Sequence, residues 1–220
     1  MTPSQLWTRW TLANAFGEMI GLGLTFAITG LFFTNLGEQN TIASILLAFA
    51  VAVLSGVVEA TIVGLAQWWA MHPWFSSIRR FAWWRATLVG ALIAYVLGYL
   101  PSTVMSMGET TSSAAPAVEP AQWIVLLLAA GMGAVGGAVL SFAQWLTLRR
   151  SVQRAGIWIP ANMLAWLLGM PLIFWGVDLA FKLPSVWQSA LVMAGSLFAA
   201  GAVVGAIHGL FLIRLTDRAR

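Results

Sequence analysis

The sequence predicts an all-α membrane protein with six transmembrane helices, arranged as three tandem helical hairpins. Three observations lead to this prediction. The chain of 220 residues is 60% hydrophobic and only 8% charged, whereas a soluble domain carries about 25% charged residues. Its apolar residues fall into six long runs, and its cationic residues gather beside alternate turns between those runs.

Each apolar run is long enough to cross a bilayer, for which a helix needs about 20 mostly apolar residues. The first run is too long for a cleaved signal peptide and resembles the later runs, so we expect it to span the membrane as well. All six runs belong to one predicted membrane domain, residues 1–220. The predicted spans cover about residues 11–33, 42–69, 83–105, 122–147, 158–181 and 186–213.

The positions of the charges predict the orientation. Ten of the 11 Lys and Arg residues fall on one side of the predicted spans, and only Lys182, beside Asp178, falls on the other. Cytoplasmic loops carry the excess of Lys and Arg, so both termini are predicted to be cytoplasmic. The far side carries Glu38, Glu109 and Glu119. The ten cationic residues are Arg9, Arg79, Arg80, Arg85, Arg149, Arg150, Arg154, Arg214, Arg218 and Arg220.

This placement explains the net charge of +4 without a nucleic-acid partner. Tryptophan is also concentrated on the same side, which is typical of an aromatic belt at the membrane interface. We therefore interpret these side chains as interfacial anchors: Trp7, Trp10, Trp68, Trp69, Trp74, Trp83, Trp84, Trp145 and Trp158.

An internal repeat predicts the three hairpins. The spacing W-x-x-A-N-x6-G runs from Trp10 to Gly21 and again from Trp158 to Gly169, with a weaker copy beginning at Trp83. Ala-Gln-Trp closes the second and fourth spans, at Gln67 and Gln144. The predicted hairpins cover about residues 7–72, 79–150 and 155–216. Each holds an even number of spans, so the repeats are parallel about an axis along the membrane normal.

Small residues recur every four positions in several spans. Such rows let helix backbones approach closely in a membrane, so we interpret them as packing surfaces. The rows are Gly17/Gly21, Gly90/Ala94/Gly98, Gly133/Gly137/Ser141 and Gly201/Gly205/Gly209. The segment Gly108–Pro120 is polar, small and contains proline, and is predicted to be a connecting loop.

The stretch from Gln144 through Arg149-Arg150 and Trp158 to Gly169 resembles a group of uncharacterised bacterial multi-pass membrane proteins. These proteins carry tandem repeats of a Gly-rich helix, Gln-Trp-x-x-Leu-Arg-Arg and Trp. The first hairpin departs from the pattern, with Ala70-Met71-His72 in place of Leu-Arg-Arg, and the third lacks Gln-Trp. The resemblance implies a polytopic protein of the bacterial inner membrane, and it implies no activity.

Ionisable residues inside a span are the candidate functional residues, because each costs about 2.5–3.5 kcal/mol on insertion scales. Glu18 and Glu59 are predicted about 12 Å and about 13.5 Å from the inner interface, at 1.5 Å per residue. His208 is predicted about 9 Å deep by the same rise. Asn14 shares the helix face of Glu18. These four residues are a candidate proton or cation site.

An alternative interpretation treats the same residues as structural. The two glutamates would then share a proton and join two helices, while His208 would bond to a backbone carbonyl. We interpret Gln67, Gln144 and Asn162 as interhelical or interfacial hydrogen-bonding residues, which mark the repeat.

Known catalytic motifs are absent. The sequence contains no H-E-x-x-H, no G-x-S-x-G and no P-loop, and it has no cysteine and only two histidines. We therefore expect no catalytic residues, no metal site and no enzyme activity, and the sequence indicates no particular cofactor.

Two functions remain. The first is a non-catalytic integral membrane protein that packs with or binds a membrane-protein partner, another copy of itself, a lipid or a pigment. The alternative is a small proton-coupled transporter or cation channel centred on Glu18 and Glu59. A solid bundle would have its glycine rows facing each other and its acids paired. A porous one would line a single cavity with Asn14, Glu18, Glu59 and His208.

Overall fold

The computed structural model of this chain describes residues 2–36, 41–109 and 120–216. It contains six helices long and apolar enough to cross a membrane, which confirms the all-α class and the six predicted spans. The helices are α1 (Pro3–Leu36), α2 (Ile42–Met71), α3 (Arg80–Glu109), α4 (Gln122–Leu148), α5 (Trp158–Phe181) and α6 (Val186–Thr216), with a short 3-10 helix η1 (Ala155–Ile157) before α5. Glu38, Glu119, Arg218, Arg220 and residues 110–119 of the predicted loop lie outside the described residues.

Local sequence explains the helix ends. α2 begins after a capping box, in which the Thr41 hydroxyl accepts from the Ser44 backbone N–H at 3.1 Å and the Ser44 hydroxyl accepts from the Thr41 N–H at 3.2 Å. This reciprocal pair satisfies two N–H groups that a helix start leaves unpaired. α1 begins at Pro3, where the missing N–H costs nothing. Most helices extend beyond the predicted spans by one or more residues.

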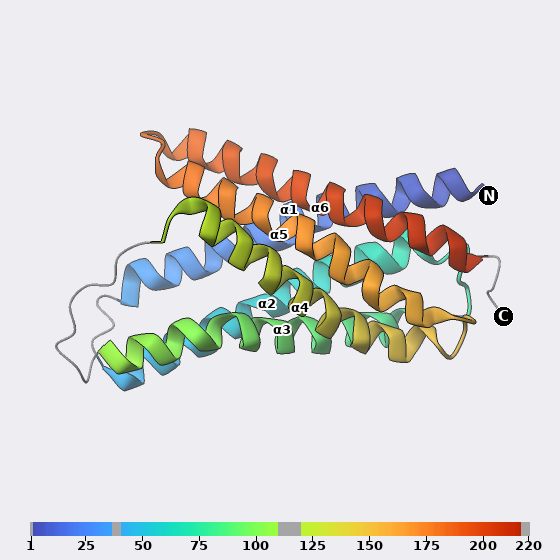
Figure 1. Cartoon of the computed structure of the whole chain (residues 1–220), viewed down its shortest axis with the longest axis horizontal. Coiled ribbons are helices and arrows are strands. Elements are labelled where there is room, and N and C mark those ends of the chain that lie inside the picture. Colours follow the sequence, from blue (N-terminus) through green and yellow to red (C-terminus); the bar gives the residue numbers. More distant parts are fainter. Residues whose placement is uncertain (1, 37–40, 110–119, 217–220) are drawn as a thin grey trace.

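The helices form a closed ring (Figure 1). Each packs against its neighbours in the sequence, and α1 also packs against α6. The start of α1, the end of α6, and the turns α2–α3 and α4–α5 lie at one end of the bundle. We call it the basic end, because Arg9, Arg79, Arg80, Arg149 and Arg150 belong to it.

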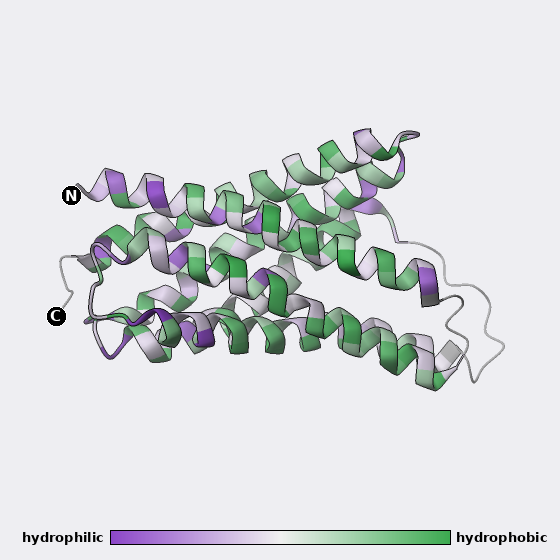
Figure 2. Cartoon of the chain, turned by 180° about the vertical axis from the view of Figure 1, so that it is seen from behind, coloured by the Kyte–Doolittle hydropathy of each residue, from purple (hydrophilic) through white to green (hydrophobic). Residues whose placement is uncertain are grey.

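The outer surface of the bundle is apolar. Figure 2 shows hydrophobic residues along the middle of the helices and hydrophilic residues near their ends. Leu31, Leu127 and Leu128 are 68%, 63% and 65% exposed. In a soluble monomer, apolar patches of this extent would promote association, whereas a bilayer solvates them.

Glycine permits the close helix contacts inside the ring. A Cβ on Gly201 would lie 2.6 Å from the Asn14 carbonyl oxygen, and one on Gly137 would lie 2.6 Å from the Asn162 carbonyl oxygen. Real Cβ atoms do not approach so closely, so any larger residue would push α6 from α1, or α4 from α5. These glycines therefore serve packing within the chain, as van der Waals contact requires in lipid.

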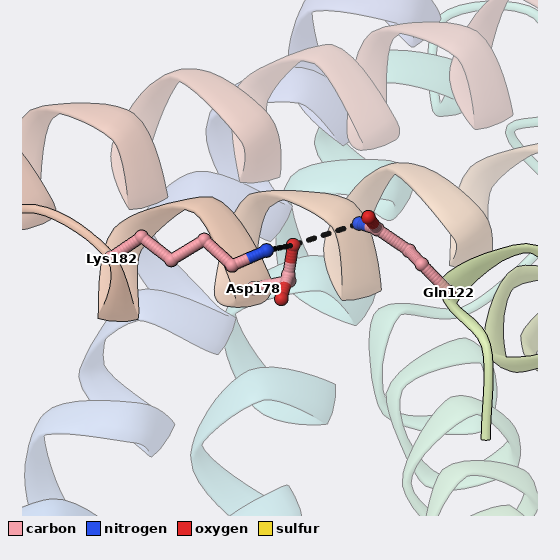
Figure 3. A network of polar contacts seen from close by, with 3 residues as sticks. All are labelled: Gln122, Asp178 and Lys182. Carbon is pink, nitrogen blue, oxygen red and sulfur yellow. Dashed lines mark hydrogen bonds and ion pairs between the residues drawn. The ribbon is translucent and has the colours of Figure 1, made fainter. Parts of the chain in front are cut away.

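The far end carries a small exposed polar network (Figure 3). Lys182 Nζ lies 2.7 Å from Asp178 Oδ2, and Gln122 Nε2 donates to the same oxygen at 2.8 Å. The contacts join the start of α4 to the end of α5. Because the ion pair is solvent-accessible, it contributes at most about 1 kcal/mol.

Candidate functional site

Three tryptophans meet at the centre of the ring near its basic end. Trp10, Trp83 and Trp158, from α1, α3 and α5, are each 0% exposed. Their ring centroids are 5.7–6.4 Å apart and pack edge to face. The prediction of interfacial anchors is therefore wrong for these three. An interfacial position in the sequence sets the depth of a side chain, but not whether it faces lipid or the bundle axis.

Two glutamines form hydrogen bonds between the helices around this tryptophan cluster. Gln67 Nε2 donates to Asn14 Oδ1 at 2.8 Å, and Gln67 Oε1 accepts from Trp83 Nε1 at 3.3 Å. Gln144 Nε2 donates to Thr87 Oγ1 at 3.0 Å and lies 3.3 Å from Gln67 Oε1. The two glutamines therefore link α1 to α4 through one buried polar layer.

Gln144 extends this layer to α5. Its Oε1 accepts from Trp158 Nε1 at 2.9 Å. Two asparagines make equivalent hydrogen bonds one turn after a central tryptophan. Asn14 Nδ2 donates to the Trp10 carbonyl and Asn162 Nδ2 donates to the Trp158 carbonyl, both at 2.8 Å. The structure thus brings Asn14, Gln67 and Gln144 into direct contact and places Asn162 in the equivalent position on α5.

His208 lies beside the same tryptophans. It is 1% exposed, and its ring centroid lies 6.4 Å from that of Trp10 and 5.1 Å from that of Trp158. Neither ring nitrogen has a hydrogen-bond partner among the described residues. The expected bond from His208 to a backbone carbonyl is therefore not formed.

Glu18 and Glu59 lie together between α1 and α2, further from the basic end. Glu18 is 1% exposed, and its Oε2 has no hydrogen-bond partner among the described residues. The helices approach closely here, since a Cβ on Gly21 would lie 3.1 Å from Glu59 Cα. Two carboxylates in a low dielectric repel each other, so the pair must share a proton or hold a cation to be stable.

Tyr95 adds a third ionisable group to this acid pair, and we did not predict it from the sequence. Its hydroxyl donates to Glu59 Oε2, and its ring packs on Gly56, where a Cβ would lie 3.0 Å from it. The Tyr95 and Tyr99 ring centroids are 5.9 Å apart. A signal was present: both tyrosines of the chain lie four residues apart in one apolar span.

The candidate site residues therefore form two groups. One is the tryptophan-centred layer with Asn14, Gln67, Gln144, Asn162 and His208, and the other is the acid pair with Tyr95. They adjoin at α1, where Asn14 is one turn from Glu18. Within residues 2–36, 41–109 and 120–216, no three His, Cys, Asp or Glu side chains gather to hold a metal ion.

Comparison with protein-family models, curated proteins and solved structures finds no match for this chain. The fold and the buried polar groups define the class as a multi-pass helical membrane protein with a polar, tryptophan-centred interior.

Proposed function

We propose that the chain is a protein of the bacterial cytoplasmic membrane, built from three tandem hairpins with both termini in the cytoplasm. The gathering of arginines at the basic end supports this orientation. The threefold arrangement is supported by the central tryptophans, since α1, α3 and α5 each supply one. The proposed repeats cover residues 7–72, 79–150 and 155–216.

Cysteine labelling tests the orientation, because the natural chain has no cysteine. Single variants Ser77→Cys, in the α2–α3 turn, and Val186→Cys, at the far end, are treated with a membrane-impermeant maleimide in intact cells. We expect label on the Val186 variant only, and on both after lysis. Label on the Ser77 variant in intact cells would reverse the orientation.

We infer that the protein is non-catalytic and binds a membrane partner on its outer surface. A packed interior supports this function. The inward glycines contact the backbones of neighbouring helices rather than each other, and tryptophan rings occupy the centre, which favours a solid bundle. The partner must therefore bind outside the ring.

A groove between α1 and α2 is the observation that carries this proposal. Its volume is about 410 Å³, and its lining is apolar except for Arg9 at the basic end. The Arg9 guanidinium lies 4.4 Å from the Trp69 ring, and its Nε has no hydrogen-bond partner among the described residues. Leu12, Phe16 and Ile20 line the rest. A single cation at the interface above an apolar channel fits a lipid with an anionic headgroup.

Native mass spectrometry of the full chain in mild detergent with anionic phospholipid tests this binding. We expect a retained lipid on the natural protein and about fivefold weaker retention by Arg9→Gln, since one interfacial cation contributes about 1 kcal/mol. Arg79→Gln is the matched control. Equal retention by both variants would exclude the groove, and a stoichiometric protein, second copy or pigment would identify a different partner.

The acid pair supports a second candidate function, a proton-coupled transporter or a cation channel. The specific observation is the hydrogen bond from the Tyr95 hydroxyl to Glu59, together with the burial of Glu18 on the adjoining helix. Such a group can bind and release one proton within the membrane.

Proteoliposomes with a pH-sensitive dye test this second function. Flux in the natural protein that is lost in the double variant Glu18→Gln/Glu59→Gln, with folding intact, would establish transport. No flux in the natural protein, together with loss of folding in the double variant, would assign the acids to helix packing.

A further inference from the structure

The hydrogen bonds around the central tryptophans repeat one donor–acceptor pattern at two places in the ring. Trp83 donates its indole N–H to Gln67 on the preceding helix, and Trp158 donates to Gln144 on the preceding helix. Each glutamine then donates its amide N–H to the helix before its own, to Asn14 from α2 and to Thr87 from α4. In the closed ring α6 packs beside α1, as α2 packs beside α3 and α4 beside α5. A third copy of the pattern would therefore take its bridging side chain from α6.

The register on α6 places His208 at the glutamine position. Gln67 follows Gly64 by three residues, Gln144 follows Ser141 by three, and His208 follows Gly205 by three. These small residues lie at buried positions between helices. A Cβ on Gly205 would lie 2.9 Å from Asn14 Cβ.

Most of the unpaired buried polar atoms around His208 are those that a third copy of the pattern requires, and Thr11 Oγ1, beside Gly205, is one more. Among the described residues, Trp10 Nε1, Asn162 Oδ1 and both ring nitrogens of His208 are buried without a hydrogen-bond partner. Trp10 and Asn162 are 0% exposed, and His208 is 1% exposed. A buried polar atom without a partner is destabilising, because it has lost its hydrogen bonds to water without replacing them.

We propose that neutral His208 is the third bridge of this layer. One ring nitrogen accepts the Trp10 indole N–H, and the other donates to Asn162 Oδ1. A neutral imidazole offers one donor and one acceptor, which are the two roles that the Gln67 and Gln144 side chains fill. The His208 and Trp10 ring centroids lie 6.4 Å apart, so the proposed bond requires the two side chains to reorient from their positions in the structure.

The third bridge differs from the other two because imidazole titrates and an amide does not. A protonated His208 has two N–H groups and cannot accept from Trp10. Protonation of His208 would therefore break this contact of α6 with α1, whereas the two glutamine bridges do not titrate, so acid destabilises the folded bundle at this helix pair. His208 is thus a proton-responsive site separate from the acid pair.

Among the residues that the structure describes, no other charged group is in contact with the His208 ring. On α1, Arg9 lies against Trp69, and Glu18 lies against Gly201, which is two turns from His208. Asp178 of α5 belongs to the far end with Lys182, and Arg214 of α6 lies over Phe211.

Thermal unfolding of the full chain in detergent, followed by tryptophan fluorescence, tests the proposal with His208→Gln and His208→Leu. At about pH 8, where the imidazole is neutral, we expect the Gln variant within about 3 °C of the natural protein and the Leu variant at least about 5 °C lower. Between about pH 8 and about pH 5, the natural protein should lose at least about 4 °C more than the Gln variant. The glutamates are common to both proteins, so their titration cancels in this comparison.

A double-mutant cycle identifies the partner. Trp10→Phe should cost less in the His208→Leu background than in the natural protein, because the bond is already absent there. A Gln variant that unfolds below the Leu variant or fails to fold, an equal pH response of natural and Gln proteins, or an additive cycle would each overturn the proposal.

Discussion

Removal of the Gln144 side-chain amide should destabilise the protein far more than removal of an amide at the bundle surface. Gln144→Leu deletes three interhelical hydrogen bonds, to Gln67, Thr87 and Trp158, and leaves the buried indole N–H of Trp158 unpaired. Interhelical hydrogen bonds in membrane proteins contribute about 0.6 kcal/mol each. An unpaired buried donor costs about 1–3 kcal/mol.

We therefore expect Gln144→Leu to lower the free energy of unfolding by about 2–3 kcal/mol, since the lost bonds and the unpaired donor partly count the same interaction. For a chain of this size that is a fall of about 4–12 °C in Tm. Gln122→Leu is the matched control, because Gln122 is exposed and makes its bond at the far end. Surface changes of this kind stay within about 0.5 kcal/mol. Equal Tm values for the two variants in detergent would refute the stabilising role of the buried layer.

Three further predictions concern helix packing, the acid pair and the ion pair at the far end, and unfolding in detergent measures each. Gly201→Ala should lower the free energy of unfolding by about 1–3 kcal/mol, because its Cβ would meet an α1 carbonyl oxygen. Gly195→Ala on the same helix has open space and should leave that free energy unchanged or raise it. Equal effects of the two variants would contradict the packing of α6 against α1. Tyr95→Phe should cost about 1 kcal/mol through its lost carboxyl bond, with Tyr99→Phe as the control that keeps that bond. Lys182→Met should change stability by less than about 1 kcal/mol, and a larger loss would contradict the solvent-accessible ion pair.

Part of the site was accessible from the sequence. Glu18 and Glu59 stood out because ionisable side chains are rare within apolar spans, and depth along two adjacent helices placed them at one level. Gln67, Gln144 and Asn162 stood out because they recur with the repeat. Tyr95 did not, because a tyrosine in a span usually serves packing, and only helix rotation aims it at Glu59.

The spans follow from the sequence alone, because a helix crosses the bilayer when its apolar run matches the thickness of the hydrocarbon core, and run length and hydrophobicity are local properties of the sequence. The side of each helix that faces inward was decided only by tertiary structure. In lipid both faces of a helix are apolar, so hydrophobic periodicity, which identifies the buried face in soluble proteins, is weak. Trp10, Trp83 and Trp158 illustrate the consequence. Their sequence positions indicated the interface. In the structure, the close packing of the helices places the three rings against each other at the centre of the bundle, beside the polar layer.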